Sequence, residues 1–241
     1  DAMIAAAGNA RVVLMVAENE RYNPLYRKMR ELLDAGAIGR PALVQSSREC
    51  YLVRSFVQDR PWFLDRRAAA GGMMMSGGVH TFETMRLLLG ELAAVQALRA
   101  PQRFLEMEGD DTSVALVRFQ SGVVGTMVQS FVMKDLHTAS GRERHAWRID
   151  GELGSMSVVD GQTIVLFSEH PEYRRGSHLS QLLIHVPPQD TFELEMAHFC
   201  HCVESGEEPL TSGRSQRRPL EAVLAAYKSM ELGGQPVVLS A

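Results

Sequence analysis

The apolar positions of the chain follow two different periods. In residues 25–35 and 79–89 they return every three or four residues, which places an apolar stripe on one face of a helix. Between residues 93 and 167, short apolar and β-branched runs are separated by turn signals: Ser121-Gly122, Asp150-Gly151 and Asp160-Gly161. The runs predict strands over residues 93–100, 112–120, 123–132, 145–149, 155–159 and 163–167. We therefore expect an α+β fold with an open, mostly antiparallel sheet and helices on one face.

The remaining segments complete this expected layer. An alternating run predicts a strand over residues 42–50, and residues 51–67 are aromatic and basic without a clear period, so an irregular segment is expected there. Two further helices are predicted over residues 189–204 and 219–232, before a short strand over residues 236–239. Several strands carry enough apolar residues for both sheet faces, which predicts association through the open face.

The first twenty residues differ from the rest. The opening Asp-Ala-Met-Ile-Ala-Ala-Ala is typical of a helix interior, and it leads into Val-Val-Leu-Met-Val at residues 12–16. A continuous apolar run of this kind suits a strand buried on both faces of a parallel sheet. Such a strand needs neighbours, so we interpret residues 1–20 as the end of another domain and residues 21–241 as a separate one.

Composition and charge exclude several classes of function. Hydrophobic residues make up 45% of the 241 residues and charged residues 22%, as in ordinary globular proteins. A formal net charge of −4 and a pI near 6.1 argue against a nucleic-acid or anionic membrane surface. The apolar runs are far shorter than the ~20 residues of a membrane helix. Three cysteines are too few for a disulfide scaffold, so a reducing, cytoplasmic setting is expected.

Residues 71–83, Gly-Gly-Met-Met-Met-Ser-Gly-Gly-Val-His-Thr-Phe-Glu, carry the main candidate chemistry. They place His80 in the first turn of a predicted helix, where backbone N–H groups point outward and the local field is positive. That field disfavours the imidazolium, so a neutral imidazole able to accept a proton is expected. His80 is thus an acid/base candidate, with a helix cap or a packed side chain as the alternative.

The glycine pattern does not predict a dinucleotide site within this chain. A Rossmann-type phosphate turn needs Gly-x-Gly-x-x-Gly between a strand and a helix, so that a pyrophosphate can reach the helix N-terminus. The glycine-rich pieces at residues 36–39 and 71–78 have a different spacing. We therefore expect the chain alone to bind no nicotinamide and to have no turnover of its own.

Several weak motifs, taken in order, resemble one family. They lie at residues 12–24, 25–41, 62–80, 110–122, 149–155 and 220–238. In this order they resemble the C-terminal domain of the glucose–fructose oxidoreductase, inositol dehydrogenase and rhizopine-catabolism (Gfo/Idh/MocA) family of NAD(P)-dependent oxidoreductases. The resemblance implies that residues 1–20 are the last helix and strand of a truncated Rossmann domain. Residues 21–241 would then form a substrate-binding and oligomerisation domain.

The resemblance also implies roles for two residues. His80 corresponds to a histidine that exchanges a proton with the substrate hydroxyl during hydride transfer. Four residues earlier the family usually carries an aspartate, where this chain has Ser76. A neutral hydroxyl can donate or accept a hydrogen bond but cannot anchor an imidazolium through charge. The family's catalytic lysine, in a Glu-Lys-Pro motif, is not in this chain.

Other residues are assigned to the substrate and the cofactor by the same resemblance. Trp62, Asp65, Arg66 and Met75 would form the wall against which a polyol or sugar lies, with a structural tryptophan, solvated charges and plain core packing as the alternatives. Arg21 would shape the nicotinamide end of the cleft or, alternatively, brace the link between domains. The expected cofactor is NAD or NADP in the full-length parent, with none bound to this chain.

The implied activity is hydride transfer between nicotinamide and a secondary alcohol, in a sugar, an inositol or a related cyclic diol, or its ketone. The implied assembly is a homodimer or homotetramer through the sheet face. The absent nucleotide motif and Ser76 leave an alternative open, in which the chain is a non-catalytic binding or assembly module.

Two further clusters of polar residues each have an interpretation that needs no ligand. The basic stretch at residues 142–148 would favour a carboxylate-bearing substrate if its arginines face the cleft, and is otherwise solvated loop charge. His198, Cys200, His201 and Cys202 resemble metal ligands, but on a helix His201 and Cys202 point about 100° apart, so no metal site is predicted. A Gly-x-Ser-x-Gly nucleophile elbow is absent from the sequence.

Overall fold

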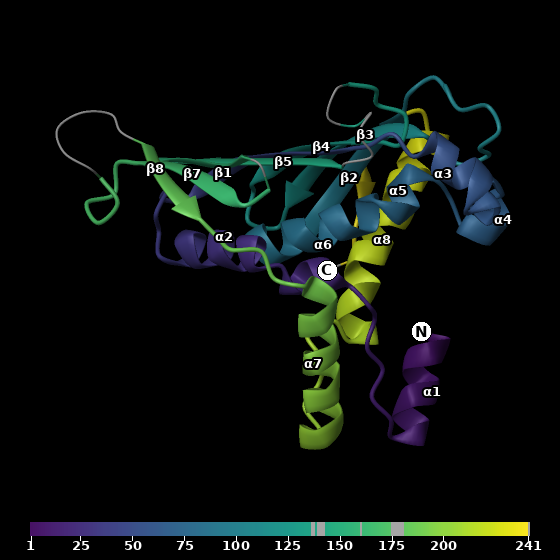
Figure 1. The fold of residues 1–241 in the computed structure, drawn as a ribbon, viewed down its shortest axis with the longest axis horizontal. Helices are drawn as coiled ribbons and strands as arrows, with labels where there is room; N and C mark the ends of the chain where they lie inside the picture. The colour runs from purple at the N-terminus through teal and green to yellow at the C-terminus, as the bar shows by residue number, and fades with distance from the viewer. Residues whose placement is uncertain (136–137, 139–142, 160, 175–180, 241) are drawn as a thin grey trace.

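Helices cover one face of a nine-stranded sheet in the computed structural model, which describes residues 1–135, 138, 143–159, 161–174 and 181–240 (Figure 1). The strand order is β8-β7-β6-β5-β1-β4-β3-β2-β9; β1 and β4 run parallel and the other neighbouring pairs antiparallel. The predicted α+β class and mostly antiparallel sheet are confirmed. The strands are β1 (Pro41–Glu49), β2 (Leu92–Arg99), β3 (Thr112–Phe119), β4 (Val124–Ser130), β5 (Arg144–Gly151), β6 (Gly154–Val159), β7 (Thr163–Ser168), β8 (Gln181–His185) and β9 (Val237–Val238).

The long helices α2 (Pro24–Asp34), α6 (Gly78–Leu89) and α8 (Gly213–Glu231) pack against the sheet. Their apolar stripes join inward-facing strand residues in one core, which includes Met29, Phe82 and Val223, all fully buried. Burying a side chain of this size contributes roughly 1.5–3 kcal/mol. Arg30 of α2 donates hydrogen bonds to the carbonyls of Leu87 and Leu88, and so covers the negative end of α6.

The opposite face of the sheet carries exposed apolar side chains. Along β3, Ala115, Val117 and Phe119 are buried while Val114 and Leu116 are exposed, which is the alternation of a strand with one covered face. Leu98 of β2 and Val124 of β4 are also exposed. As the sequence indicates, the sheet has apolar residues on both faces.

The prediction of an irregular segment over residues 51–67 is wrong. This stretch folds into α3 (Val53–Gln58), the 3-10 helix η2 (Pro61–Leu64) and α4 (Arg66–Ala69). Phe56 and Phe63 stack with their ring centroids 4.6 Å apart, and both meet Phe131 edge-on. These contacts form a second, smaller core, so tertiary packing stabilises helices that show no period in the sequence.

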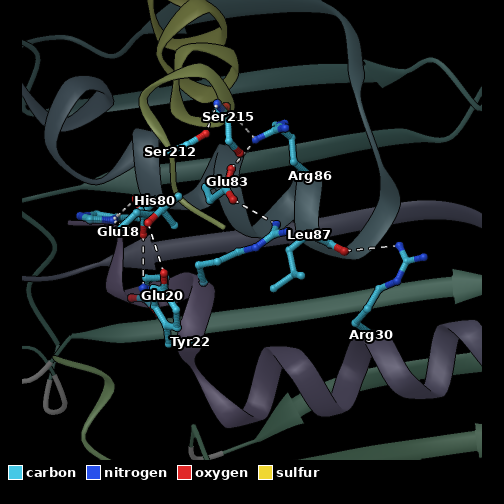
Figure 2. Close-up of polar contacts among 12 residues, drawn as sticks. Glu18, Glu20, Tyr22, Arg30, His80, Glu83, Arg86, Leu87, Ser212 and Ser215 are labelled. Atoms are coloured by element: carbon cyan, nitrogen blue, oxygen red, sulfur yellow. Dashed lines mark hydrogen bonds and ion pairs between the residues drawn. The ribbon is translucent and has the colours of Figure 1, made fainter. Parts of the chain in front are cut away.

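Helix α8 begins at Gly213, six residues before the predicted start. The prediction placed Pro219 at the first position of the helix, whereas it lies inside it. A proline within a helix leaves the carbonyl four residues earlier without its N–H partner. Here that carbonyl belongs to Ser215, and it accepts a hydrogen bond of 3.2 Å from Arg86 Nη1 (Figure 2). The side chain of Arg86 thus replaces the missing backbone donor and lets the helix run through.

The N-terminal helix and helix α7 (Thr191–Ser205) lie away from the sheet. Helix α1 (Ala2–Ala10) buries none of its residues, and both α1 and α7 extend downward in Figure 1. The strand expected at residues 12–16 is limited to one bridge between Met15 and Ser212. Strand β8 does not follow from the sequence pattern. In the described part of the chain, the helices are too short or too polar to span a bilayer.

Candidate acid/base site

The glycine-rich turn before α6 is held by one tyrosine and one aspartate. Tyr227 Oη accepts hydrogen bonds from the N–H groups of Gly72 (2.9 Å) and Met75 (3.1 Å) and donates to Asp110 Oδ1 (2.8 Å). Asp110 Oδ2 accepts from the Met74 N–H. A Cβ at position 72 would collide with the backbone of Asp110, so only glycine allows this approach. The turn, including α5 (Met73–Ser76), therefore determines where α6 begins and where His80 lies.

His80 is paired with a buried carboxylate. Its Nδ1 atom lies 2.8 Å from both Oε1 and Oε2 of Glu18, which is only 2% exposed (Figure 2). Glu18 precedes the 3-10 helix η1 (Asn19–Tyr22) and caps it by accepting the Glu20 N–H. Because a carboxylate only accepts, Nδ1 carries the hydrogen and Nε2 keeps the lone pair. A carboxylate at this distance also stabilises the imidazolium that forms when Nε2 takes a proton.

Glu18 is a candidate site residue that sequence reasoning missed. The sequence argument considered only the field of the helix around His80. In the structure, His80 contacts a carboxylate that is 62 residues away in the chain. The available signal was an acidic residue placed directly after the apolar run at residues 12–17. Ser76 lies one turn before His80, and its backbone N–H bonds to the Gly72 carbonyl. Its proposed catalytic part stays a prediction.

A second buried carboxylate faces the same region from α7. Asn19 donates a 2.7 Å hydrogen bond to Thr191, and the rings of Tyr22 and His198 lie 5.4 Å apart, so α7 packs along η1. Glu195 lies on this face of α7, one turn after Thr191. It is 3% exposed, and Oε1 has no hydrogen-bond partner among the described residues. Burial raises the pKa of Glu195, and the charge of Glu18 adds to the rise.

Arg21 belongs to a separate ion-paired cluster. Its Nη1 atom lies 3.1 Å from Oε1 of Glu83, whose Oε2 lies 2.6 Å from Arg86 Nη1 (Figure 2). Glu83 is fully buried, and Arg86 also forms an ion pair with Glu91. These contacts fit the alternative in which Arg21 braces the link into the domain, while its role toward a cofactor stays a prediction.

His80 borders a small recess of about 10 Å³, which adjoins a larger groove. The recess at His80 is lined by Ser46, Thr81 and Thr84, together with five residues that it shares with an adjoining groove of about 850 Å³: Glu20, Tyr26, Arg48, His145 and Trp147. The register of β1 and β5 explains the lining, since Arg48 pairs with His145 and Ser46 with Trp147. These residues lie on the helix-covered side of the two strands. A ligand seated in the groove would lie along β1 and β5, next to the recess at His80.

Three of the four residues predicted to line the substrate wall, Trp62, Asp65 and Arg66, lie beside the second core. Trp62 is 53% exposed and rests against Phe63, while Asp65 caps α4 by accepting from the Arg67 and Ala68 N–H groups. The Arg66 N–H bonds to Glu108. Among the residues with described placement, none of these three side chains contacts His80. Met75 packs on the main core. Their substrate roles stay predictions.

The described residues of the basic stretch and the His/Cys cluster lie in different parts of the structure, at β5 and on α7. Arg144 pairs with Glu49 and Asp135, and Arg148 pairs with Asp150; Arg142 lies outside the described residues. In the helix that carries the His/Cys cluster, His198 Nε2 accepts from the Leu210 N–H. Within the described ranges, no three His, Cys, Asp or Glu side chains gather as metal ligands would.

The chain belongs to the GFO/IDH/MocA family. The family's C-terminal domain matches residues 26–158, which include β1, the glycine-rich turn, α6 and His80. The resemblance inferred from the order of the motifs is therefore confirmed.

Characterised relatives and solved structures agree with this assignment. The chain is 28% identical over 232 residues to 1,5-anhydro-D-fructose reductase of Ensifer adhaerens, and 28% identical over 240 residues to myo-inositol 2-dehydrogenase of Thermotoga maritima. Each alignment covers 96% of this chain and 66% of the relative, so the chain spans just under two thirds of their length.

Two solved structures share the fold. An oxidoreductase from Agrobacterium radiobacter, in complex with NAD+, L-tartaric acid and magnesium, superposes with a TM-score of 0.84 at 22% identity, over 98% of this chain and 68% of that one. Levoglucosan dehydrogenase in complex with NADH and levoglucosan gives a TM-score of 0.81 at 19% identity, over 95% of this chain and 67% of that one.

Proposed function

We propose that this chain is the substrate-binding and proton-transfer part of an NAD(P)-dependent oxidoreductase. Its substrate would be a secondary alcohol in a sugar, an inositol or a related cyclic diol, or the corresponding ketone. The observation that carries the proposal is the pair formed by His80 and buried Glu18, beside a small recess that adjoins a groove. Relatives that act on 1,5-anhydro-D-fructose and myo-inositol support the substrate class.

In this proposal His80 handles the hydroxyl proton. Oxidising a secondary alcohol requires a base that takes the O–H proton while hydride leaves the carbon. Nδ1 is engaged by Glu18, so the proton moves to Nε2. The resulting imidazolium is stabilised by the Glu18 carboxylate, which is held in place by its own hydrogen bond from the Glu20 N–H. In the reverse direction the same Nε2–H protonates the carbonyl oxygen.

The described residues do not fit a dinucleotide phosphate. The glycine-rich turn is closed against the chain itself, since a Cβ on Gly71 would meet Tyr227 and one on Gly77 would meet Met73 and Gln129. A phosphate cradle instead needs open backbone N–H groups. When bound, the nicotinamide would supply the hydride acceptor. We assign binding of its phosphates to the part of the relatives that this chain does not cover. Among the described residues, His80 would carry the proton and Glu18 would stabilise the charge that His80 gains.

Replacing His80 by Asn in the complete oxidoreductase tests the proposal. Loss of an acid/base group lowers kcat by about 10²-fold or more. The substrate's dissociation constant, measured by titration in the same variant, should change only a few-fold. Retained turnover would refute the role of His80, and a wild-type enzyme that binds a polyol without oxidising it would favour a non-catalytic binding module.

We further propose that the chain forms a homodimer or homotetramer through the open sheet face. Leu98, Leu116 and Val124 are exposed there, and the last two line a hollow of about 410 Å³. An exposed apolar face of this kind is an association site. Light scattering of the wild-type chain and of Leu116→Glu should give an oligomer and a monomer, respectively.

A further inference from the structure

The groove beside His80 contains an arginine whose ligand-binding edge is already occupied. Arg48 Nε lies 3.2 Å and Nη2 3.0 Å from Oε2 of Glu143, and its Nη1 lies 3.7 Å from Glu20. Its side chain is 17% exposed. The Nε/Nη2 edge is one by which a guanidinium binds a carboxylate in parallel. The chain's own glutamate therefore fills the position that an acidic ligand would take.

Glu143 is fixed from a second side. His145 Nε2 lies 2.8 Å from the same Oε2 atom. The hydrogen bond with His145, together with the Arg48 charge, lowers the pKa of Glu143 to about 2. Glu143 thus stays ionised throughout the range in which an enzyme works, and its hold on Arg48 persists there.

The other charges around this position are also paired. Arg144 is opposite Glu49 in the β1–β5 register and contacts both Glu49 and Asp135. Glu20 accepts a hydrogen bond from Asn23 Nδ2 while it faces Arg48. A ligand entering the groove therefore meets arginines that are ion-paired with carboxylates. It also meets two glutamates, Glu20 and Glu143, whose oxygens can accept hydrogen bonds from hydroxyl groups.

This balance discriminates between ligand charges. To pair with Arg48, a ring acid must displace Glu143 and leave two carboxylates next to each other, and like charges placed so close cost several kcal/mol. A neutral polyhydroxylated ring needs no displacement, because its hydroxyls donate to carboxylates and accept from arginine.

We propose that Glu143 is a specificity-determining residue, which makes the groove select neutral polyols over ring acids by occupying Arg48. The inference deepens the proposed function and rests on its placement of the substrate beside His80. It bears on the basic stretch at residues 142–148, because Glu143 of that stretch pairs with Arg48 of β1, and Arg144, which also lines the groove, pairs with Glu49 and Asp135.

The test compares two probes on the 241-residue chain, myo-inositol and D-glucuronate, by calorimetric or NMR titration. In Glu143→Gln the affinity for D-glucuronate relative to myo-inositol should rise at least tenfold, because the Arg48 edge becomes available. In Arg48→Gln/Glu143→Gln this gain should disappear. Glu152→Gln is the matched control, since it frees Arg40 outside the groove and should leave the ratio unchanged.

Glu20→Gln provides a second variant in case Glu143→Gln does not fold, which circular dichroism will show. It removes the weaker partner of Arg48, so the ratio should rise two- to threefold. The proposal is overturned by an unchanged ratio in folded variants, by a gain that survives loss of Arg48, or by no saturable binding of either probe to the wild-type chain. Binding needs no hydride transfer, so these outcomes are distinct from a failure of the His80→Asn test.

Discussion

Two buried glutamates near α6 have opposite surroundings. Glu83 has one arginine on each carboxylate oxygen, Arg21 at 3.1 Å and Arg86 at 2.6 Å, and its side chain is inaccessible to solvent. Glu18 directs both oxygens to one histidine nitrogen, and the other side of that histidine borders a recess. The first acid is enclosed by fixed positive charge. The second faces a group that gains or loses its charge with a proton.

The difference separates a structural carboxylate from one suited to catalysis. A buried acid held by two guanidinium groups has a constant partner charge, since arginine keeps its proton. An acid held by imidazole has a partner that can exist with or without a charge. Removing Glu83 should therefore affect stability most, and removing Glu18 should affect turnover most.

The largest expected effect is on stability, in Glu83→Gln. Loss of the carboxylate leaves Arg21 without its partner and Arg86 with Glu91 alone, in a buried setting. Removing one member of a buried ion pair costs about 3–5 kcal/mol. Urea unfolding of both proteins measures the difference. Glu91→Gln is the control, because it removes a partly exposed partner of the same arginine and should cost about 1 kcal/mol or less.

The next effect is on turnover, in Glu18→Gln. The amide still accepts the Nδ1 hydrogen bond but no longer stabilises the imidazolium by charge, so kcat of the complete enzyme should fall about 10²-fold, or about 2.7 kcal/mol. The free energy of unfolding should change by less than about 1 kcal/mol. Equal losses of turnover and stability would contradict the separation of the two glutamates.

A rescue variant sharpens the Glu18 prediction. Ser76 lies one turn before His80, close enough for a carboxylate at that position to face the imidazole. Ser76→Asp added to Glu18→Gln should restore part of the lost turnover. If turnover stays at the level of the single variant, charge on the imidazole is not what Glu18 provides.

The smallest effect concerns Glu195 and depends on pH. Burial raises its pKa in the folded chain, so its contribution to stability is fully present below the ordinary glutamate pKa of about 4.3 and is lost as pH rises through the raised value. Glu195→Gln stays neutral and should become more stable than wild type by about 1 kcal/mol above that range, the low end of the cost of an unsatisfied buried group.

Urea unfolding between pH 4 and 8 measures the Glu195 effect. Glu204→Gln, on the same helix but exposed, is the control and should follow the wild-type curve. A constant difference between Glu195→Gln and wild type at every pH would contradict ionisation as the cause.

Local chemistry made much of the fold predictable. The hairpin turns and alternating runs predicted β2 to β7, and the apolar stripe after the glycine-rich turn predicted α6 within one residue. The sequence failed where packing replaces local preference. Helices α3 and α4 depend on the aromatic cluster at Phe131, and α8 passes through Pro219 because Arg86 supplies the missing donor.

The sequence by itself determined the class of fold, the family and the candidate histidine, since each follows from neighbouring residues or from motif order. Tertiary structure alone decided which charges meet. Glu18 reaches His80 across 62 residues, and Glu143 reaches Arg48 across 95. Propensity and periodicity act within a few turns of chain, whereas such pairs depend on strand order and on which helix covers which strand. The partner of the histidine and the state of the groove arginine therefore appear only in the folded chain.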